Sequence, residues 1–237
     1  MTAEPKVEFD RERASQYDLD IRRAIPGYEA LHDMTVSCLQ TSLPKTARVL
    51  VVGSGTGKEL VDLSEKFPQW LLTGVEPSAA MMAIAKQKLS DRKIEHQINL
   101  HIGYLDSLPR EEPMDAATLI LVMHFLPDDG SKLRLLQNIA RHLKLGAEIV
   151  IADLHGDRST HSFNRQMQAW KSYYFKRLDA ITRAKAELEF EPSIQNSIYF
   201  VSEARMIELL SSAGFEQIAK FYNAFLFGGW IAKYVGT

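Results

Sequence analysis

The sequence has little of what several protein classes require. Its 237 residues contain one cysteine, Cys38, so no disulfide can form within the chain. No run approaches the roughly 18 uninterrupted apolar residues of a membrane helix, and the charged N-terminus predicts no secretory signal. Neither sign of charge dominates, with 28 basic and 30 acidic residues. We expect a cytoplasmic protein with no membrane span, for which nucleic acid is a disfavoured partner.

The hydrophobic content of the chain predicts a globular protein with a buried core. Hydrophobic residues make up 46% of the chain, enough for one α/β domain and a modest insertion. No internal repeat or low-complexity tract divides it. We therefore expect a single domain over residues 1–237.

The most informative segment is VLVVGSGTG, residues 49–57. Four apolar residues in a row are typical of a central parallel strand covered on both faces, and the glycines allow a ligand to approach the backbone closely. Helical spacing of apolar residues begins at once, at Lys58. The spacing is not that of the dinucleotide fingerprint, because its third glycine comes one residue early. A strand, a glycine turn and a helix follow one another here.

A second marker lies at the end of the next strand. Trp70 to Val75 is strand-like and ends in Glu76, which lies 19 residues beyond Gly57. A carboxylate in this position can accept hydrogen bonds from both hydroxyls of a ribose. Pro77 then leads into a helix. We expect a nucleoside-binding edge.

The remaining pattern alternates strands with helices, which predicts a Rossmann-like, doubly wound, mainly parallel sheet of seven strands. The end of the chain predicts an antiparallel hairpin. The expected elements are strands 49–52, 71–76, 97–101, 116–121 and 147–153, helices 58–67, 78–89 and 131–143, and the hairpin within 215–234.

Two helical segments flank this core. Residues 1–16 are polar and expected to be mobile, and helices follow up to residue 45, with Pro26 separating two of them. Residues 156–200 form a helical insertion whose aromatic side chains recur at helical spacing. That stripe is consistent with plain core packing or with a cap that contacts substrate. Residues 46–155 are expected to bind the cofactor, and 201–237 to form a last helix and the hairpin.

Several motifs together resemble class I S-adenosylmethionine-dependent methyltransferases: VLVVGSGTG, GVEPSAAMM, LILVMHFL and LKLGAEIVIAD. Within that superfamily, IRRAIPGYEAL, SSAGF and FLFGGWIAKY are similar to the carboxy-S-adenosylmethionine synthase group. The resemblance implies S-adenosylmethionine as cofactor. It also implies that the backbone at Gly53, Ser54 and Gly55 receives the methionine part, that Glu76 binds the ribose and that Pro77 lies beside it.

The resemblance implies further cofactor contacts. Tyr28 matches a tyrosine that closes over the cofactor, although a buried core tyrosine is an equal alternative, and Met81 or Met82 would pack on the adenine. Where the family has Gly-Asp and an apolar residue, this chain has Gly103, Tyr104, Leu105 and Asp106. Either Tyr104 and Leu105 take over the adenine contact, which we favour, or Asp106 reaches back to it. Two positions depart from the family: Val51 replaces an acidic residue, and Ile120 a polar one that faces the cofactor.

The synthase group recognises the extra carboxylate of its ligand with an arginine in the helix before AGF. The matching position here is Leu209, and Arg205 lies one helical turn earlier. A shift of four residues changes the reach and angle of a bidentate guanidinium. We therefore favour ordinary methyl transfer.

Methyl transfer requires a general base only for weakly acidic acceptors. His124 follows the fourth strand, and Asp153 and His155 follow the fifth, so a base would be found among them, although each is individually better explained as structural. The other histidines show no metal-ligand spacing, and we expect no metal site.

We therefore interpret the chain as a methyltransferase acting on a small-molecule acceptor that the sequence does not identify. One alternative is a carboxy-S-adenosylmethionine synthase-like enzyme of transfer-RNA wobble modification. Another is a protein that binds S-adenosylmethionine without turnover. The apolar N-terminal helices and the aromatic insertion could also bury a homodimer contact.

Overall fold

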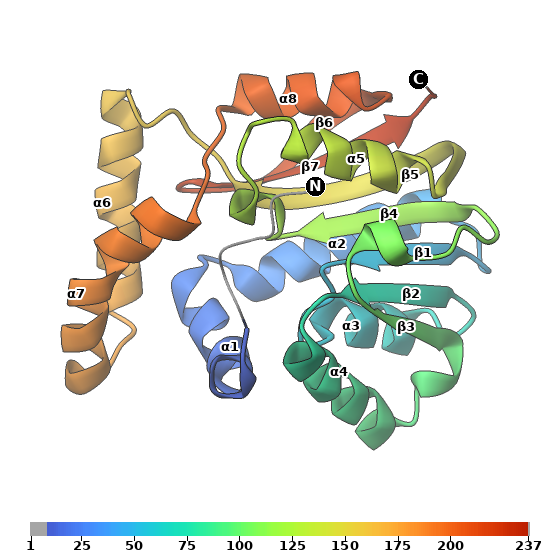
Figure 1. The fold of residues 1–237 in the computed structure, drawn as a ribbon, viewed down its shortest axis with the longest axis horizontal. Coiled ribbons are helices and arrows are strands. Elements are labelled where there is room, and N and C mark those ends of the chain that lie inside the picture. The colour runs from blue at the N-terminus through green and yellow to red at the C-terminus, as the bar shows by residue number, and fades with distance from the viewer. Residues whose placement is uncertain (1–8, 237) are drawn as a thin grey trace.

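The computed structural model describes residues 9–236, which form one seven-stranded sheet with helices on both faces (Figure 1). The strand order is β3-β2-β1-β4-β5-β7-β6. The four pairings from β3 to β5 in this order are parallel, and β7 runs antiparallel to both β5 and β6. The strands are β1 (Arg48–Val52), β2 (Leu71–Glu76), β3 (Ile98–Ile102), β4 (Met114–Ile120), β5 (Leu143–Leu154), β6 (Phe215–Ala224) and β7 (Phe227–Tyr234). The predicted doubly wound sheet and C-terminal hairpin are confirmed.

Helices cover both faces of the sheet because its central strands are apolar on both sides. Every residue of β1 from Val49 to Val52 is buried. Figure 1 shows α5 and α8 on one face and α2, α3 and α4 on the other. These helices are α2 (Tyr28–Ser42), α3 (Lys58–Lys66), α4 (Ala79–Arg92), α5 (Ser131–Ala140) and α8 (Glu203–Ser212).

The chain reverses direction across the sheet between β1 and β4. From β1 it proceeds outward through β2 to β3, and then returns to β4 on the other side of β1. Loops that leave the carboxyl ends of β1 and β4 therefore diverge, and ligands of open α/β sheets bind in the crevice between them. The glycine loop, Gly53–Gly57, begins at this crevice.

The N-terminal segment is more ordered than its composition predicts. Helix α1 (Arg11–Ala24) begins within the segment expected to be mobile, and the Asp10 carboxylate caps it by accepting from the Arg13 N–H at 2.9 Å. Just before it, the Phe9 carbonyl accepts a hydrogen bond from the Ser78 hydroxyl at 2.7 Å. The expectation of mobility is wrong for residues 9–16, because this tertiary contact holds a polar segment in place; residues 1–8 lie outside the described part of the chain.

The insertion forms two helices, α6 (His161–Phe175) and α7 (Ala180–Ser197), which pack side by side at one end of the sheet (Figure 1). Trp170 connects the pair to the rest of the protein. Its indole N–H donates to the Ala24 carbonyl at 2.7 Å, and its ring lies edge-on to Phe190 and Phe227, 5.3 and 5.0 Å away. The aromatic face thus packs against α1 and β7.

Element boundaries differ most at β5, which begins at Leu143 rather than at residue 147. Leu143 pairs with Met114 of β4, so the strand already exists before the turn-like Gly146, and α5 ends at Ala140 to leave room for it. Between residues 9 and 236, no helix combines the length and the apolar character that crossing a membrane requires.

Candidate active site

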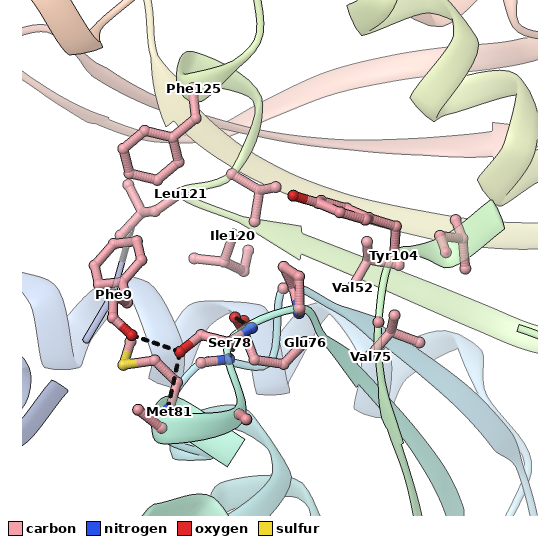
Figure 2. Close-up of a pocket in the computed structure, with 18 of the residues that line it drawn as sticks. Phe9, Val52, Val75, Glu76, Ser78, Met81, Tyr104, Ile120, Leu121 and Phe125 are labelled. Atoms are coloured by element: carbon pink, nitrogen blue, oxygen red, sulfur yellow. Dashed lines mark hydrogen bonds between the residues drawn. The ribbon is translucent and has the colours of Figure 1, made fainter. Parts of the chain in front are cut away.

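A pocket of about 460 Å³ opens at the carboxyl ends of β1 to β4; we call it the main pocket. Loops after all four of these strands line it, together with the N-terminal segment (Figure 2). The loop after β5 does not line it. The lining residues that carry the argument are Phe9, Tyr17, Gly53, Gly55, Glu76, Pro77, Met81, Tyr104, Leu105, Ile120, Leu121 and Phe125.

Glu76 lies at the base of the main pocket with its carboxylate held by two backbone amides. One oxygen accepts from the Gly55 N–H at 3.1 Å and the other from the Ser78 N–H at 2.8 Å. The side chain is 7% exposed, and this burial raises its pKa above the ordinary value, against the effect of the two amides. Each carboxylate oxygen keeps a further lone pair for a ligand hydroxyl. Glu76 can therefore grip two adjacent hydroxyls without moving.

The glycine loop requires glycine for two different reasons. Gly53, Gly55 and Gly57 all have φ between +52° and +84°, a conformation that disfavours any side chain. A Cβ on Gly53 would collide with the Val122 side chain, whereas one on Gly55 would only touch Met81, at 3.6 Å. At Gly53 the nearest obstacle to a side chain is therefore the loop after β4.

Behind the glycine loop lies a recess of about 30 Å³, which shares Tyr17, Gly53, Gly55, Ile120 and Leu121 with the main pocket. Tyr28 and Ser54 face this recess rather than the main pocket. Three buried polar atoms around it have no hydrogen-bond partner among the described residues: Ser54 Oγ, His32 Nε2 and Glu59 Oε1. Buried polar groups normally have partners, so these atoms are suited to receive the polar tail of a ligand.

Tyr104 and Leu105 line one side of the main pocket, and Met81 lines it on the side of Phe9. In Figure 2 the Tyr104 ring extends over the pocket from the side opposite Phe9. Asp106 lies outside, in a separate depression where it accepts from the Asn138 amide. Of the two methionines, Met81 lines the pocket, whereas Met82 is fully buried in the protein. This placement favours Tyr104 and Leu105 over Asp106 for contact with a flat base.

The two residues that depart from the family pattern, Ile120 and Val51, lie in different parts of the structure. Ile120 lines both the main pocket and the recess. Val51 is fully buried and packs in the core beneath α2 and α3, away from both. An apolar residue at position 51 therefore fills the core in this chain.

The sequence did not single out Phe9, Tyr17 and Phe125 as site residues, yet all three line the main pocket. Phe9 lies edge-on to Tyr17 at 5.7 Å and to Phe125 at 6.0 Å. Phe9 and Tyr17 belong to the N-terminal segment, whose position over the pocket is a tertiary contact. Phe125 could have been noticed, since it is an aromatic residue directly after the β4 edge.

The charges of the main pocket have one sign. Among its described lining residues, the ionisable side chains normally charged at neutral pH are Asp10 and Glu76, and none is lysine, arginine or histidine. Leu209 is buried in the core, and Arg205 is paired with Asp128 at 2.9 and 3.1 Å, away from the pocket. The pocket is therefore suited to a cationic ligand rather than to one with added carboxylates.

A second cavity of about 270 Å³ adjoins the main pocket; we call it the aromatic cavity. The two share Phe9, Tyr17, Leu121 and Phe125. Its other lining with apolar or aromatic side chains comes from α1, β5, α6 and β7 and from the residues that follow α1 and α7: Ile21, Ala24, Ile25, Leu154, Trp170, Tyr174, Ile198 and Phe227. Arg13 and Asp20 lie at its exposed rim.

His124 lines the aromatic cavity and is paired with Asp153. His124 Nδ1 lies 2.6 Å from Asp153 Oδ1, and the other carboxylate oxygen accepts the His124 backbone N–H at 3.2 Å. The Leu154 N–H also donates to Oδ1, at 2.7 Å. Burial disfavours the Asp153 anion, but the charge and hydrogen bond of His124, with Lys132 and Leu154, hold the pKa of Asp153 below its usual value.

His155, the third candidate base, lies elsewhere. Its ring is edge-on to Trp230 at 5.2 Å, and burial together with nearby Lys220 lowers its pKa. It lines neither the main pocket nor the aromatic cavity. Within residues 9–236, no group of three or more histidine, cysteine or carboxylate side chains is arranged to hold a metal ion.

Comparisons with known proteins agree with this geometry. A family described as "Methyltransferase domain" matches residues 49–146, from β1 to the glycine within β5. The carboxy-S-adenosyl-L-methionine synthase of Campylobacter hominis is 35% identical over 83 residues, which cover 35% of this chain and 36% of that protein. The corresponding enzyme of Methylococcus capsulatus is 26% identical over 94% of this chain and 92% of its own length. The first match thus spans only about a third of the relative.

Solved structures support the same fold. Magnesium protoporphyrin IX methyltransferase of Synechocystis, with S-adenosylhomocysteine bound, aligns with a TM-score of 0.63 over 98% of this chain and 90% of that one, at 15% identity. The sheet order, the pocket at the ends of β1 to β4 and these similarities agree with the motifs in the sequence. Residues 49–146 thus match a methyltransferase domain, and the fold of the chain is that of S-adenosylmethionine-dependent methyltransferases of known structure.

Proposed function

We propose that this protein transfers a methyl group from S-adenosylmethionine in the main pocket to a small-molecule acceptor in the aromatic cavity. The observation that carries the proposal is the contact between the two spaces. They meet at Phe9, Tyr17, Leu121 and Phe125, and no charged side chain stands among these four shared residues. A ligand in each would therefore lie against the other with water excluded from between them.

The residues of the main pocket fit the cofactor from end to end. Glu76 would accept both ribose hydroxyls, while Tyr104, Leu105 and Met81 would contact the adenine and Pro77 would border the sugar. The methionine tail would lie along Gly53 and Gly55 toward the recess, where the Ser54 hydroxyl and Tyr28 stand. Ile120 would lie beneath the sulfur end, where the main pocket meets the recess.

When bound, S-adenosylmethionine supplies an electrophilic methyl group on a positively charged sulfur. The protein's part is to hold an acceptor in line with that group and to keep water away. The aromatic cavity provides this with Phe125 and Phe9, which lie between it and the main pocket, and with α6, whose Trp170 covers its far side. The acceptor is thus expected to be compact and largely apolar.

The absence of basic side chains from the described lining of the main pocket favours methyl transfer over carboxy-S-adenosylmethionine synthesis. No lysine, arginine or histidine among the described residues of the main pocket would offset the negative charge of an added carboxylate on the cofactor. Mass spectrometry of ligand retained through purification tests this, because the carboxylated cofactor is heavier. Recovery of the heavier species would contradict our proposal.

Isothermal titration tests cofactor binding and its placement. The unaltered protein should bind both S-adenosylmethionine and S-adenosylhomocysteine. Glu76→Ala should weaken each by about 10- to 100-fold, since it removes hydrogen bonds to a charged acceptor. Glu65→Ala is the matched control, because Glu65 pairs with Arg92 on the surface, outside the pockets. Failure of either ligand to bind at millimolar concentration would contradict the proposal.

Product formation distinguishes an enzyme from a protein that binds the cofactor without turnover. Incubation with S-adenosylmethionine and a panel of small acceptors should release S-adenosylhomocysteine; binding without any release would support the non-catalytic alternative. A homodimer and a cytoplasmic location remain predictions, for which sedimentation velocity and cell fractionation are the direct measurements.

A further inference from the structure

Among the described side chains that line the aromatic cavity and can hydrogen-bond, only His124 and Trp170 are buried, whereas Tyr17 and Tyr174 are half-buried; Asp153 lies behind His124. His124 is 6% exposed, and that exposure faces the cavity that it lines. The indole N–H of Trp170 is already bonded to the Ala24 carbonyl, and Arg13 and Asp20 lie at the rim. A polar group of a ligand that enters this cavity fully would therefore meet the imidazole.

The pairing with Asp153 determines which nitrogen of His124 is available. Asp153 is buried, and its lowered pKa means that it is ionised and can only accept hydrogen bonds. Nδ1, 2.6 Å from Oδ1, must therefore carry the hydrogen. In the neutral ring Nε2 is then a bare lone pair, and no described residue donates to it. The carboxylate also stabilises the ring once Nε2 has gained a proton.

Hydrogen bonds also fix the position of His124. It belongs to the short helical turn Met123–Phe125, whose Met123 carbonyl accepts from the buried Lys132 ammonium, and its own carbonyl accepts the Tyr199 N–H at 2.8 Å. Its ring lies 4.0 Å from that of Phe125, one of the residues shared with the main pocket. His124 thus stands beside the junction of the two spaces.

We propose that His124 is the general base of this site, and that the acceptor is a flat apolar molecule with one weakly acidic hydroxyl, a phenol or an enol. This inference rests on the proposed methyltransferase function and adds the acceptor's chemical class. Asp153 is a positioning residue, because it acts only through His124.

The chemistry balances without a further reactant. The hydroxyl O–H bond breaks as its proton passes to His124 Nε2, and an oxygen lone pair forms the new bond to the methyl carbon. The methyl–sulfur bond breaks, its electron pair stays on sulfur, and the proton leaves to solvent in a later step. The products are a methyl ether and neutral S-adenosylhomocysteine.

The cavity distinguishes a hydroxyl from the other common acceptors. An ammonium group would need a carboxylate facing it, but the inner carboxylate, Asp153, already receives three N–H groups and is 1% exposed. A thiol ionises readily without a paired histidine. The apolar, ring-lined shape is suited to a flat body of about the size of a substituted benzene, and a phenol offers a proton that requires a base at neutral pH.

Other ionisable groups around the cavity must be considered in any pH dependence. Arg13, Tyr17 and Asp20 face it from α1, and Tyr174 from α6. Burial raises the pKa of both tyrosines, so they stay neutral near pH 7. From β5 and α5, Asp153 and Lys132 approach His124. A fall in the methylation rate at low pH is therefore assigned to His124 only if a His124 variant no longer shows that fall.

The first test reads proton transfer without turnover, using 4-nitrophenol, whose anion absorbs at longer wavelength than its acid. With S-adenosylhomocysteine bound and at a pH where free 4-nitrophenol is mostly protonated, the unaltered protein should increase the absorbance of the anion. His124→Gln should bind the probe but leave it protonated. His155→Gln is the matched control and should behave as the unaltered protein. Absence of binding, or ionisation that persists in His124→Gln, would overturn the assignment.

The second test compares 4-methylphenol, 4-methylaniline and 4-methylthiophenol as acceptors. The phenol should be methylated, and His124→Gln should lower kcat by about 10²-fold with little change in KM, and should abolish the acidic limb of the pH profile. Asp153→Asn should shift that profile. Unchanged melting temperatures and cofactor affinities identify variants that still fold. Methylation of only the aniline or the thiol would overturn the acceptor class alone, whereas loss of cofactor binding in the unaltered protein would overturn the methyltransferase function itself.

Discussion

Gly57 begins α3 at the point where α3 and α4 approach most closely. Its φ is +84°, and a Cβ there would lie 2.9 Å from the Ala85 Cβ and 3.1 Å from its Cα. The second distance involves backbone, so the neighbour cannot swing away. Gly57 is thus constrained both by its dihedral angle and by space, and the closeness of the two helices holds the glycine loop in position.

Gly57→Ala should lower the free energy of unfolding by about 2–4 kcal/mol, from left-handed strain and overpacking together. Gly146→Ala is the matched control, since Gly146 has φ +83° but its Cβ would meet only the Lys233 side chain, at 3.7 Å. It should cost about 1–2 kcal/mol. Urea unfolding measures both; equal losses would show that the contact with Ala85 is unimportant.

Glu59 follows the glycine loop as a buried carboxyl, 7% exposed, and burial raises its pKa from 4.5 to about 7. The unfolded chain releases this proton at lower pH than the folded one. The difference in proton affinity between the folded and unfolded states stabilises the folded protein fully below about pH 4.5, and this stabilisation is lost as the pH rises to about 7. His32, whose pKa burial lowers to about 3, contributes the opposite slope below about pH 6.5.

Glu59→Gln separates the contribution of the Glu59 carboxyl to the pH dependence of stability from that of His32. The variant should gain stability relative to the unaltered protein between pH 4.5 and pH 7, by up to about 3 kcal/mol. Urea unfolding at several pH values measures the difference between the two proteins, in which the contribution of His32 cancels. A difference that does not change with pH would contradict the raised pKa of Glu59.

At the scale of elements, α6 and α7 form a unit that contacts the rest of the protein mainly through aromatic side chains. Trp170 and Phe190 pack within the pair, and Phe227 of β7 and the Ala24 carbonyl of α1 receive Trp170 from outside it. The outer side of α7 exposes Ile181 and Leu188 at 86% and 78%. The pair therefore depends on its inner face for position.

Trp170→Ala should destabilise the protein by about 3–5 kcal/mol, because it removes a large buried ring and a hydrogen bond. Hydrogen exchange should increase in α6 and α7, while β1 and β4 stay protected, since the insertion packs at one end of the sheet. Ile181→Ala, at an exposed position on α7, should change neither measurement. Equal loss of protection in the central strands would show that the insertion and the sheet unfold together.

At the scale of the whole molecule, the main pocket joins segments that are far apart in sequence. The main pocket takes residues from the N-terminal segment, from the four strand ends and from α5. The Ser78 hydroxyl, which donates to the Phe9 carbonyl at 2.7 Å, also caps α4 through the Met81 N–H at 3.2 Å. A ligand there binds only the assembled fold and so stabilises all of it.

S-adenosylhomocysteine at about 100 times its Kd should stabilise the protein by about 2.7 kcal/mol and raise Tm by roughly 5–10 °C. Thermal unfolding followed by circular dichroism measures the shift. Glu76→Ala should show a smaller shift at the same ligand concentration, and methionine alone should show none. A rise of equal size in Glu76→Ala would mean that the ligand binds elsewhere.

The parts of this protein that the sequence predicted are those that depend on local chemistry. Apolar runs, glycines and turn residues predict strands, helices and the loop Gly53–Gly57, because periodicity and backbone freedom act over a few residues. Glu76 was found in the same way, as the last residue of a strand. The boundaries of β5 were missed because pairing between Leu143 and Met114 is not local.

Only the tertiary structure decided how distant segments meet. It placed Phe9 and Tyr17 over the main pocket, paired His124 with Asp153 across 29 residues, and moved His155 to another surface. The sequence by itself determined a Rossmann-like methyltransferase fold with a carboxylate, Glu76, at the end of β2, because both follow from the order of its strands and glycines. The acceptor side depended on packing between non-neighbouring helices and loops, where small changes of position decide which side chains share a cavity.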